Sequence, residues 1–213
     1  MTLLYLVRHG ETDWNRARRI QGSTDIPLNR TGRGQAATTG ALLARREWDG
    51  IYSSPLSRAF ETAGIISAAA GLGEPQVIDA IVERNYGTAE GMTGFEIDRR
   101  FPPGTEVPGR ESRDEVAERV LPALLHLADE HPNQSLIVVS HGGVIRSILS
   151  AVHPESSREP IRNGSIHSFR HDDGELTLIA FDDPIEIESL DCAEDELEEQ
   201  NAIEGRESAG VGR

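Results

Sequence analysis

Short apolar segments alternate with segments of helical character along most of this 213-residue chain. Strands are predicted at residues 3–8, 50–53, 76–80 and 135–140, and helices at 31–46, 54–71, 112–130 and 142–150. Near the end, the segments 166–170 and 176–181 flank a turn and predict a hairpin, which would add an antiparallel edge. Strands separated by helices are typical of parallel sheets that are covered on both faces. The alternation therefore predicts an α/β fold, a three-layer α/β/α sandwich with a mostly parallel central sheet.

Residues with strong positional preferences predict several helix boundaries. Ser54 and Pro55 are expected to begin the second helix, as N-cap and first residue, and Gly71 is expected to end it. Thr31 is expected to cap the first helix. Pro122 falls inside the third helix, and we expect it to bend or break that helix.

The acidic residues are concentrated at the carboxyl end of the chain. Residues 183–213 hold 11 acidic and 2 basic side chains, and so carry −9 of the total net charge of −15. This segment has few large apolar side chains with which to build a core. We therefore expect one domain over 1–182, followed by a disordered acidic tail over 183–213. Within the domain, residues 83–110 are rich in Gly, Pro and charge and are expected to form a loop with one short helix near 93–101.

Composition excludes several classes of protein. The single cysteine, Cys192, excludes an internal disulfide and a metal cluster built from cysteines. No apolar stretch is long enough to span a bilayer and no signal peptide is evident, so no membrane association and a cytoplasmic location are expected. An isoelectric point near 4.8 argues against nucleic acid as a partner. All 21 basic residues are arginines, so an anion site has to use guanidinium groups, backbone N–H groups or histidines.

Four predicted strands are followed by residues capable of chemistry. Arg8 and His9 end the first strand, His141 and Gly142 follow the strand at 135–140, Arg58 lies shortly after the second strand, and Glu83 after the third. In α/β sheets, functional groups gather beyond the carboxyl ends of the strands. These residues are therefore the candidates for a site. The remaining histidines are expected to be packing or surface residues: His126, His131, His153, His167 and His171.

The segment 6–15, Leu-Val-Arg-His-Gly-Glu-Thr-Asp-Trp-Asn, resembles the signature of the histidine phosphatase superfamily, also called the phosphoglycerate mutase-like family. Further segments match the family in the same order: 21–22, 25–28, 53–59, 83–87 and 140–143. The resemblance spans roughly residues 3–182 and implies the fold of that family.

The resemblance also implies the role of each matching residue. His9 would take up the phosphoryl group as the nucleophile, and Glu83 would protonate the leaving oxygen. The phosphate would be held by Arg8, Asn15, Gln21, Gly22, Arg58, His141 and Gly142. Two arginines and His141 would supply positive charge, while His9 has to be neutral to attack. The reaction would need neither a metal nor another cofactor.

The predicted function is that of a metal-independent phosphomonoester hydrolase acting through a phosphohistidine on a small phosphorylated metabolite. A cofactor-dependent phosphoglycerate mutase is the alternative. Only 28 residues separate Glu83 from Ser112, and so short a connection resembles the phosphatase branch of the family. Arg99, Arg100 and Arg110 are bases that could bind a substrate carboxylate, so the mutase remains an alternative. A catalytically silent phospho-ligand-binding protein is a third hypothesis, disfavoured because the reactive residues are all present.

The substrate and the oligomeric state are less constrained by the sequence. Arg16, Arg18 and Arg19 would favour a multiply charged substrate if they line the entrance, but they would serve equally well as surface charge. The expected partner is a small-molecule phosphomonoester, and a monomer or a homodimer is expected.

Overall fold

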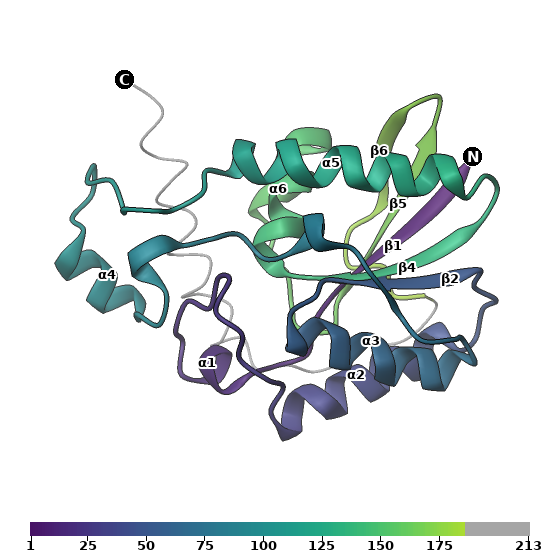
Figure 1. Cartoon of the computed structure of the whole chain (residues 1–213), viewed down its shortest axis with the longest axis horizontal. Coiled ribbons are helices and arrows are strands. Elements are labelled where there is room, and N and C mark those ends of the chain that lie inside the picture. The colour runs from purple at the N-terminus through teal and green to yellow at the C-terminus, as the bar shows by residue number, and fades with distance from the viewer. Residues whose placement is uncertain (186–213) are drawn as a thin grey trace.

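A computed structural model describes residues 1–185 of the chain (Figure 1). A six-stranded sheet with the order β3-β2-β4-β1-β5-β6 forms its centre. The strands are β1 (Thr2–Arg8), β2 (Gly50–Ser53), β3 (Gln76–Val77), β4 (Ser135–Ser140), β5 (Ile166–Asp172) and β6 (Glu175–Ala180). The α-helices are α1 (Asp13–Arg16), α2 (Arg30–Leu43), α3 (Ser57–Ala70), α4 (Gly94–Arg100), α5 (Arg113–Glu130) and α6 (Gly142–Val152). Short 3₁₀ helices lie at Asp79–Ile81, Gly87–Ala89 and Pro154–Arg158.

The sheet is mixed, with a parallel part and an antiparallel edge. Strands β1, β4, β2 and β3 pair in parallel, whereas β5 pairs antiparallel to β1 and to β6. The predicted α/β fold with a mostly parallel central sheet is therefore confirmed, and so is the terminal hairpin. The third strand is shorter than predicted, because the chain turns into a 3₁₀ helix at Asp79–Ile81.

Alternate residues of the central strands face two separate hydrophobic clusters, as the two-residue period of a strand requires. On one face Leu4 and Leu6 of β1 pack in a cluster with residues of α5 and α6. On the other face Tyr5 and Val7 pack in a cluster with residues of α3 and with Leu43 at the end of α2. Figure 1 shows α5 and α6 on one side of the sheet and α2 and α3 on the other. These three layers hold the central strands in a fixed position.

Two of the predicted helix caps are wrong. The N-cap of α2 is Asn29, whose Oδ1 accepts the N–H of Gly32 at 2.8 Å. Helix α3 begins at Ser57, whose N–H donates to the carboxylate of Asp25 at 2.9 Å, so the cap comes from a distant loop and not from Ser54. The predicted end of α3 is confirmed, because Gly71 adopts the left-handed conformation with φ 70°.

Helix α5 runs unbroken through Pro122, so the predicted break is wrong. Pro122 lies on the exposed face of the helix. The buried side chains of Val116, Val120 and Leu124 hold the opposite face against the sheet on both sides of the proline. This packing outweighs the one backbone hydrogen bond that a proline removes. Helix α4 forms where a short helix was predicted, with Thr93 as its N-cap.

Two of the first three residues of the predicted acidic tail, Asp183 and Ile185, contact the domain. Asp183 donates its N–H to the carbonyl of Ile166 at 2.7 Å, and the Ile185 side chain is only 3% exposed. The remainder of the tail, with Cys192, lies outside the described residues. In the part of the chain that is described, no helix is both long enough and apolar enough to cross a membrane.

Leu124 provides a test of the packing between α5 and the sheet. We expect Leu124→Ala to lower the free energy of unfolding by about 2–5 kcal/mol, because it leaves a cavity in a fully buried position. The control His126→Ala, on the exposed face of the same helix, should change it by less than about 0.5 kcal/mol. Urea denaturation followed by circular dichroism measures both. A loss at Leu124 no larger than that at His126 would contradict the assigned core.

Candidate active site

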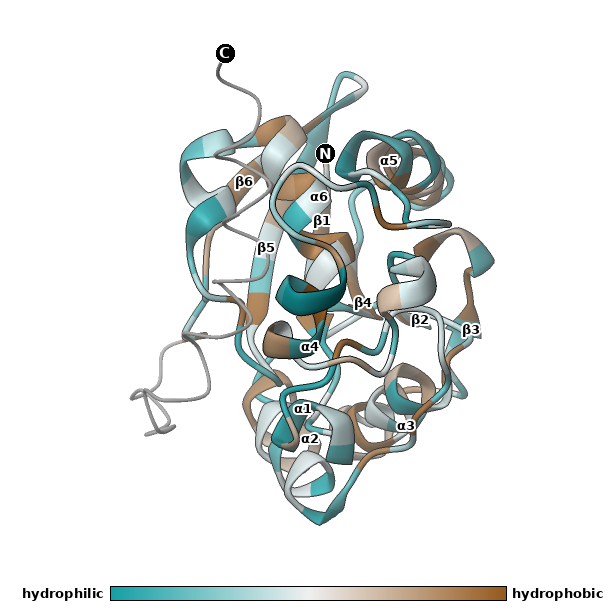
Figure 2. Ribbon diagram, turned by 90° about the vertical axis from the view of Figure 1, so that its left-hand side faces the viewer, coloured by the Kyte–Doolittle hydropathy of each residue, from teal (hydrophilic) through white to brown (hydrophobic). Residues whose placement is uncertain are grey.

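The parallel strands bring two histidines together at the carboxyl end of the sheet. Strand β1 pairs with β4 so that Arg8 lies opposite Ser140. Each of these residues is followed in the sequence by a histidine, His9 or His141. The N–H of His9 donates to the carbonyl of Ser140 at 3.0 Å. The rings of His9 and His141 lie edge to face, with centroids 5.2 Å apart. Figure 2 shows α1 and α4 lying over this carboxyl end of the sheet.

The hydrogen bonding of His9 fixes which ring nitrogen can react. Its Nδ1 lies 2.7 Å from the carbonyl oxygen of Gly10. A carbonyl can only accept, so Nδ1 carries the proton and the lone pair of the neutral ring is on Nε2. Burial lowers the pKa of His9 well below its usual value, and the cations of Arg58 and Arg8 lower it further. The imidazole is therefore neutral near pH 7 and suited to attack through Nε2.

Two buried guanidinium groups provide the positive charge of the site. Arg8 is 3% exposed, and its Nη1 donates to the carbonyl of Ile161 at 2.5 Å. Arg58 is fully buried, and its two terminal nitrogens donate to the carbonyls of Gly22 and Thr24 at 2.7 and 2.8 Å. Its Nε is buried and has no hydrogen-bond partner among the described residues. Burial lowers the pKa of Arg58, but an arginine remains protonated in proteins.

His141 is buried and occupies the N-cap position of α6. Its Nε2 lies 2.7 Å from the hydroxyl of Ser54, and its Nδ1 is buried without a partner in residues 1–185. Burial lowers the pKa of His141 well below its usual value, and Arg58 and His9 add to this effect. The expectation that His141 contributes positive charge is therefore wrong for the ligand-free site. The ring offers a hydrogen-bonding nitrogen, and the charge comes from the arginines.

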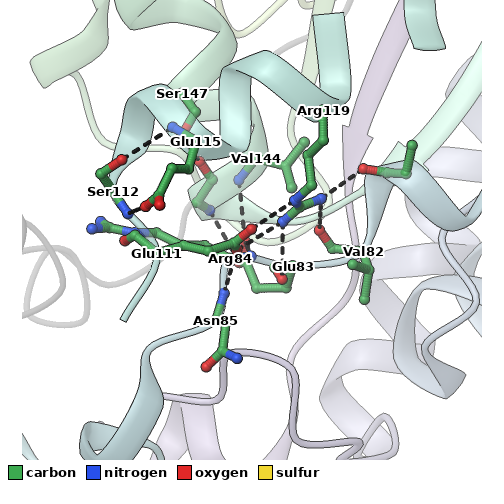
Figure 3. A network of polar contacts seen from close by, with 12 residues as sticks. Val82, Glu83, Arg84, Asn85, Glu111, Ser112, Glu115, Arg119, Val144 and Ser147 are labelled. Carbon is green, nitrogen blue, oxygen red and sulfur yellow. Dashed lines mark hydrogen bonds and ion pairs between the residues drawn. The ribbon is translucent and has the colours of Figure 1, made fainter. Parts of the chain in front are cut away.

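Glu83 binds the beginning of α6. Its carboxylate accepts backbone N–H groups from Gly143 at 3.0 Å, Val144 at 3.1 Å and Arg84 at 2.7 Å (Figure 3). The first N–H groups of a helix have no partner within the helix, which is why a carboxylate fits there. A Cβ on Gly143 would lie 2.6 Å from the Oε1 of Glu83, so only glycine admits this approach. This contact ties Glu83 to the helix that follows His141.

Arg119 holds the segment that carries Glu83, a role that was not predicted. From α5, its Nη1 donates to the carbonyls of Ala80 and Val82 at 2.6 and 2.9 Å (Figure 3). Its Nε and Nη2 also bind both carboxylate oxygens of Glu111 at 2.9 and 3.0 Å. The long helix therefore fixes the backbone on which Glu83 stands.

The other predicted phosphate-binding residues lie in the loop after β1 and at the start of α6. The side-chain oxygens of Asn15 and Gln21 both accept hydrogen bonds from Thr12. Gly22 lies beside Arg58 through its carbonyl group, as described above. Gly142 is the first residue of α6, where helical N–H groups lack a partner within the helix. The structure thus places each predicted site residue at or beside this end of the sheet.

Glu90 organises the loop that holds Arg58, and it too was not predicted. Its two carboxylate oxygens accept the backbone N–H groups of Ser23 and Thr24, each at 2.9 Å, and also bind their hydroxyl groups. Gly22 adopts φ 58°, and a Cβ there would lie 2.0 Å from the Oε1 of Glu90. Glu90 therefore fixes the loop whose carbonyls orient the Arg58 guanidinium.

No group of three or more His, Cys, Asp or Glu side chains within residues 1–185 is arranged to hold a metal ion.

The sequence profile of the histidine phosphatase superfamily (branch 1) matches residues 4–184. The chain belongs to this superfamily. The match covers the strand ends, the Arg58 helix and the Glu83 segment described above. The resemblance seen in the sequence is confirmed.

Individual relatives agree with this membership. The chain is 42% identical to the uncharacterised phosphatase PhoE of Bacillus subtilis (strain 168), over 71% of this chain and 78% of that protein. It is 33% identical to a metal-independent phosphoserine phosphatase of Arabidopsis thaliana, over 89% and 85% of the two chains. Among solved structures, a mutant phosphoserine phosphatase of Entamoeba histolytica in complex with phosphoserine matches with a TM-score of 0.73 and 32% identity, over 85% of this chain and 97% of that one. The superfamily and these phosphatases assign the chain as a histidine phosphatase-type phosphoric monoester hydrolase.

Glu90→Gln tests the link between the loop and Arg58. We expect kcat/KM for a phosphomonoester to fall by about 10- to 100-fold, because an amide cannot accept hydrogen bonds at both ends. The matched control is Glu61→Gln, which removes a surface ion pair with Arg33 and should leave kcat/KM unchanged. Steady-state kinetics measures both variants. Equal activity of the Glu90 variant and wild type would show that the loop holds Arg58 without the carboxylate.

His167 tests the electrostatics of the buried interior. Burial, assisted by Arg146 and Arg8, lowers the pKa of His167 to about 3, whereas in the unfolded chain it is about 6.5. Between these values the unfolded state binds a proton that the folded state does not, so stability falls as the pH decreases. Replacing His167 should reduce this slope by about 1.4 kcal/mol per pH unit.

The measurement compares wild type with His167→Gln by urea denaturation at pH 6, 5 and 4. The Nδ1 of His167 accepts the backbone N–H of Asp182, so the proton of the neutral ring is on Nε2, which donates to the Ser165 hydroxyl at 2.9 Å. Glutamine retains a nitrogen that can donate to Ser165. His126→Gln, at an exposed position, is the control and should leave the slope as in wild type. The same slope in all three proteins would mean that His167 titrates normally in the folded state.

Proposed function

We propose that this protein is a metal-independent phosphomonoester hydrolase that acts on a small phosphorylated metabolite through a phosphohistidine at His9. The observation that carries the proposal is the state of His9, which is neutral, has its lone pair on Nε2 and lies in the field of two buried arginines. A phosphomonoester carries negative charge that repels a nucleophile, and fixed cations remove that barrier.

Substrate binding places the phosphoryl group between these cations. Arg8 and Arg58 neutralise its oxygens, and further hydrogen bonds come from uncharged groups. In the proposal these are the side chains of Asn15, Gln21 and His141 and the backbone at Gly22 and Gly142. The Nε of Arg58 and the Nδ1 of His141 are buried polar atoms without a partner in residues 1–185, and a phosphate oxygen would satisfy them.

The first chemical step transfers the phosphoryl group to the enzyme. The Nε2 lone pair of His9 forms the P–N bond while the P–O bond to the substrate alcohol breaks. Glu83, in its protonated form, gives its proton to the departing oxygen, and the alcohol leaves. The Nδ1–H bond to Gly10 stabilises the positive charge that develops on the ring.

The second step returns the enzyme to its starting state. Glu83, now a carboxylate, takes a proton from water as the water oxygen forms a bond to phosphorus and the P–N bond breaks. Inorganic phosphate leaves, and His9 is neutral again. In the ligand-free site both carboxylate oxygens of Glu83 accept backbone N–H groups, which hold the side chain at the start of α6.

Phosphoserine is the first candidate substrate, because the Arabidopsis relative and the Entamoeba structure are both phosphoserine phosphatases. Arg16, at the end of α1, and Arg19, shortly after it, give little support for a more highly charged substrate. Arg16 pairs with Asp13 at 3.5 Å, and Arg19 binds the carbonyl of Gly91 at 2.5 Å and the carboxylate of Glu96 at 3.3 Å. In the proposal the enzyme is cytoplasmic, acts as a monomer or homodimer, and binds neither nucleic acid nor membranes.

The first experiment incubates metal-stripped protein with a panel of phosphomonoesters that includes phosphoserine and 3-phosphoglycerate. Inorganic phosphate and 2-phosphoglycerate are followed together, with and without 2,3-bisphosphoglycerate. We expect phosphate release without isomer formation. Dominant isomer formation would assign a phosphoglycerate mutase, and binding without turnover would assign a silent phospho-ligand-binding protein.

His9→Ala tests the covalent intermediate. We expect turnover to be abolished, because in the proposed mechanism the variant lacks the nucleophile that takes up the phosphoryl group. Wild-type protein quenched during turnover of a ³²P-labelled substrate should carry acid-labile label, and the His9 variant should carry none. Retained turnover in the variant would rule out the phosphohistidine mechanism.

A further inference from the structure

Thr12 lies three residues after His9 and is completely buried. It is the N-cap of α1, the short helix at Asp13–Arg16. None of the roles carried over from the sequence resemblance falls on this residue. Its side chain nevertheless contacts two of the proposed phosphate-binding amides, those of Asn15 and Gln21.

The hydrogen atoms around Thr12 can be assigned one by one. Its backbone N–H donates to the Oδ1 of Asn15 at 3.1 Å. Its hydroxyl oxygen accepts the backbone N–H of Asn15 at 3.2 Å. The single hydroxyl hydrogen has two acceptors within reach, the Oε1 of Gln21 at 2.8 Å and the Oδ1 of Asn15 at 3.2 Å. Because the bond to Gln21 is shorter and Asn15 already has the backbone N–H, the hydroxyl donates to Gln21.

This assignment determines how both amides are oriented. A side-chain amide has one accepting oxygen and one donating NH₂ on opposite branches of a planar group. Thr12 binds the oxygen of each, so the NH₂ of each points away from Thr12. Across the described part of the chain, no hydrogen bond occupies the Nδ2 of Asn15 or the Nε2 of Gln21. Both NH₂ groups therefore remain as donors for an anion.

We propose that Thr12 is a positioning residue that turns the NH₂ groups of Asn15 and Gln21 toward the transferring phosphoryl group. The proposal rests on the proposed function, since it assumes that the two amides bind phosphate. An anion needs donors only, and an amide that rotates by 180° would present its oxygen and repel the anion instead. The buried hydroxyl of Thr12 prevents this rotation at Gln21, and its N–H prevents it at Asn15.

A purely structural role for Thr12 as a helix cap predicts a different pattern of results. The cap consists of the reciprocal contacts between Thr12 and Asn15. The bond from the Thr12 hydroxyl to Gln21 lies outside the helix and adds nothing to the cap. Variants that affect stability alone can therefore be separated from variants that affect the binding of an anion through Gln21.

The test compares Thr12→Val, which keeps the shape but removes the hydroxyl, with Thr12→Ser, which retains it. We expect Thr12→Val to weaken the binding of inorganic phosphate, measured by calorimetry and as a competitive inhibition constant, by about tenfold. Thr12→Ser should remain within about twofold of wild type. If Thr12→Val does not fold, Thr12→Ala removes the same hydroxyl and takes its place. Thr2→Val is the matched control, since Thr2 is a buried threonine at the opposite end of β1 whose hydroxyl binds the carbonyls of Ala128 and His131.

A double-mutant cycle identifies the route by which Thr12 acts. In a Gln21→Ala background, Thr12→Val should cause little further loss of phosphate affinity, because its partner is already absent. A full additional loss in that background, or no loss in Thr12→Val alone, would overturn the role of Thr12. If instead Asn15→Ala and Gln21→Ala both leave phosphate affinity unchanged, the proposed phosphate site itself is wrong. The two failures are thereby distinguishable.

Discussion

The parallel pairing of β1 with β4 determines where the reactive groups lie. Both strands are in the interior of the sheet, and their side chains alternate between two hydrophobic clusters. A slip of one residue in the register would turn the side chains of each cluster to the opposite face of the sheet, where they would meet the other pair of helices. Packing therefore specifies the register strongly. Since Arg8 lies opposite Ser140 in that register, His9 and His141 follow as neighbours. The position of the proposed nucleophile is thus a consequence of core packing.

The burial of two positively charged side chains, Arg8 and Arg58, is a second constraint on the site. Transfer of a guanidinium from water into a protein interior is costly unless polar groups surround it. Carbonyl oxygens of Ile161, Gly22 and Thr24 partly satisfy Arg8 and Arg58. Burial lowers the pKa of His9 and the remaining positive field lowers it further, which keeps the ring neutral, and the same field favours a dianion. In the proposed mechanism, one arrangement therefore both keeps the nucleophile neutral and attracts the substrate.

The central strands and the residues at their ends were predictable because each depends on a local pattern. Short continuous apolar segments identify β1, β2 and β4, and the position of His9 or His141 follows from where its strand ends. Ser54 was assigned incorrectly because its local sequence fits an N-cap, whereas its hydroxyl binds His141, which is 87 positions away. Glu90 could not be recognised for a similar reason. Its partners Ser23 and Thr24 lie in another loop, and a single sequence contains no signal that joins two loops.

The site divides into a rigid part and a part that depends on loops. His9, His141 and the Glu83 contact to α6 are fixed by strand ends and a helix start, which the core holds in place. Arg58 and the amides of the loop after β1 are instead oriented by polar contacts, through Glu90 and Thr12. Phosphoryl transfer needs its reacting atoms fixed most accurately, and they lie in the rigid part.

In the proposed function, α4 and the loop around it are the candidates for contact with the organic part of the substrate, because Figure 2 shows this segment over the carboxyl end of the sheet. Few buried side chains hold this region, and Phe95 on α4 is 75% exposed. Changes in this region can alter which phosphomonoester fits without moving His9 or the arginines. The division explains in physical terms how relatives with different substrates can share one arrangement of strand ends. In the proposed function, reaction chemistry depends on the sheet, and substrate choice depends on the loops above it.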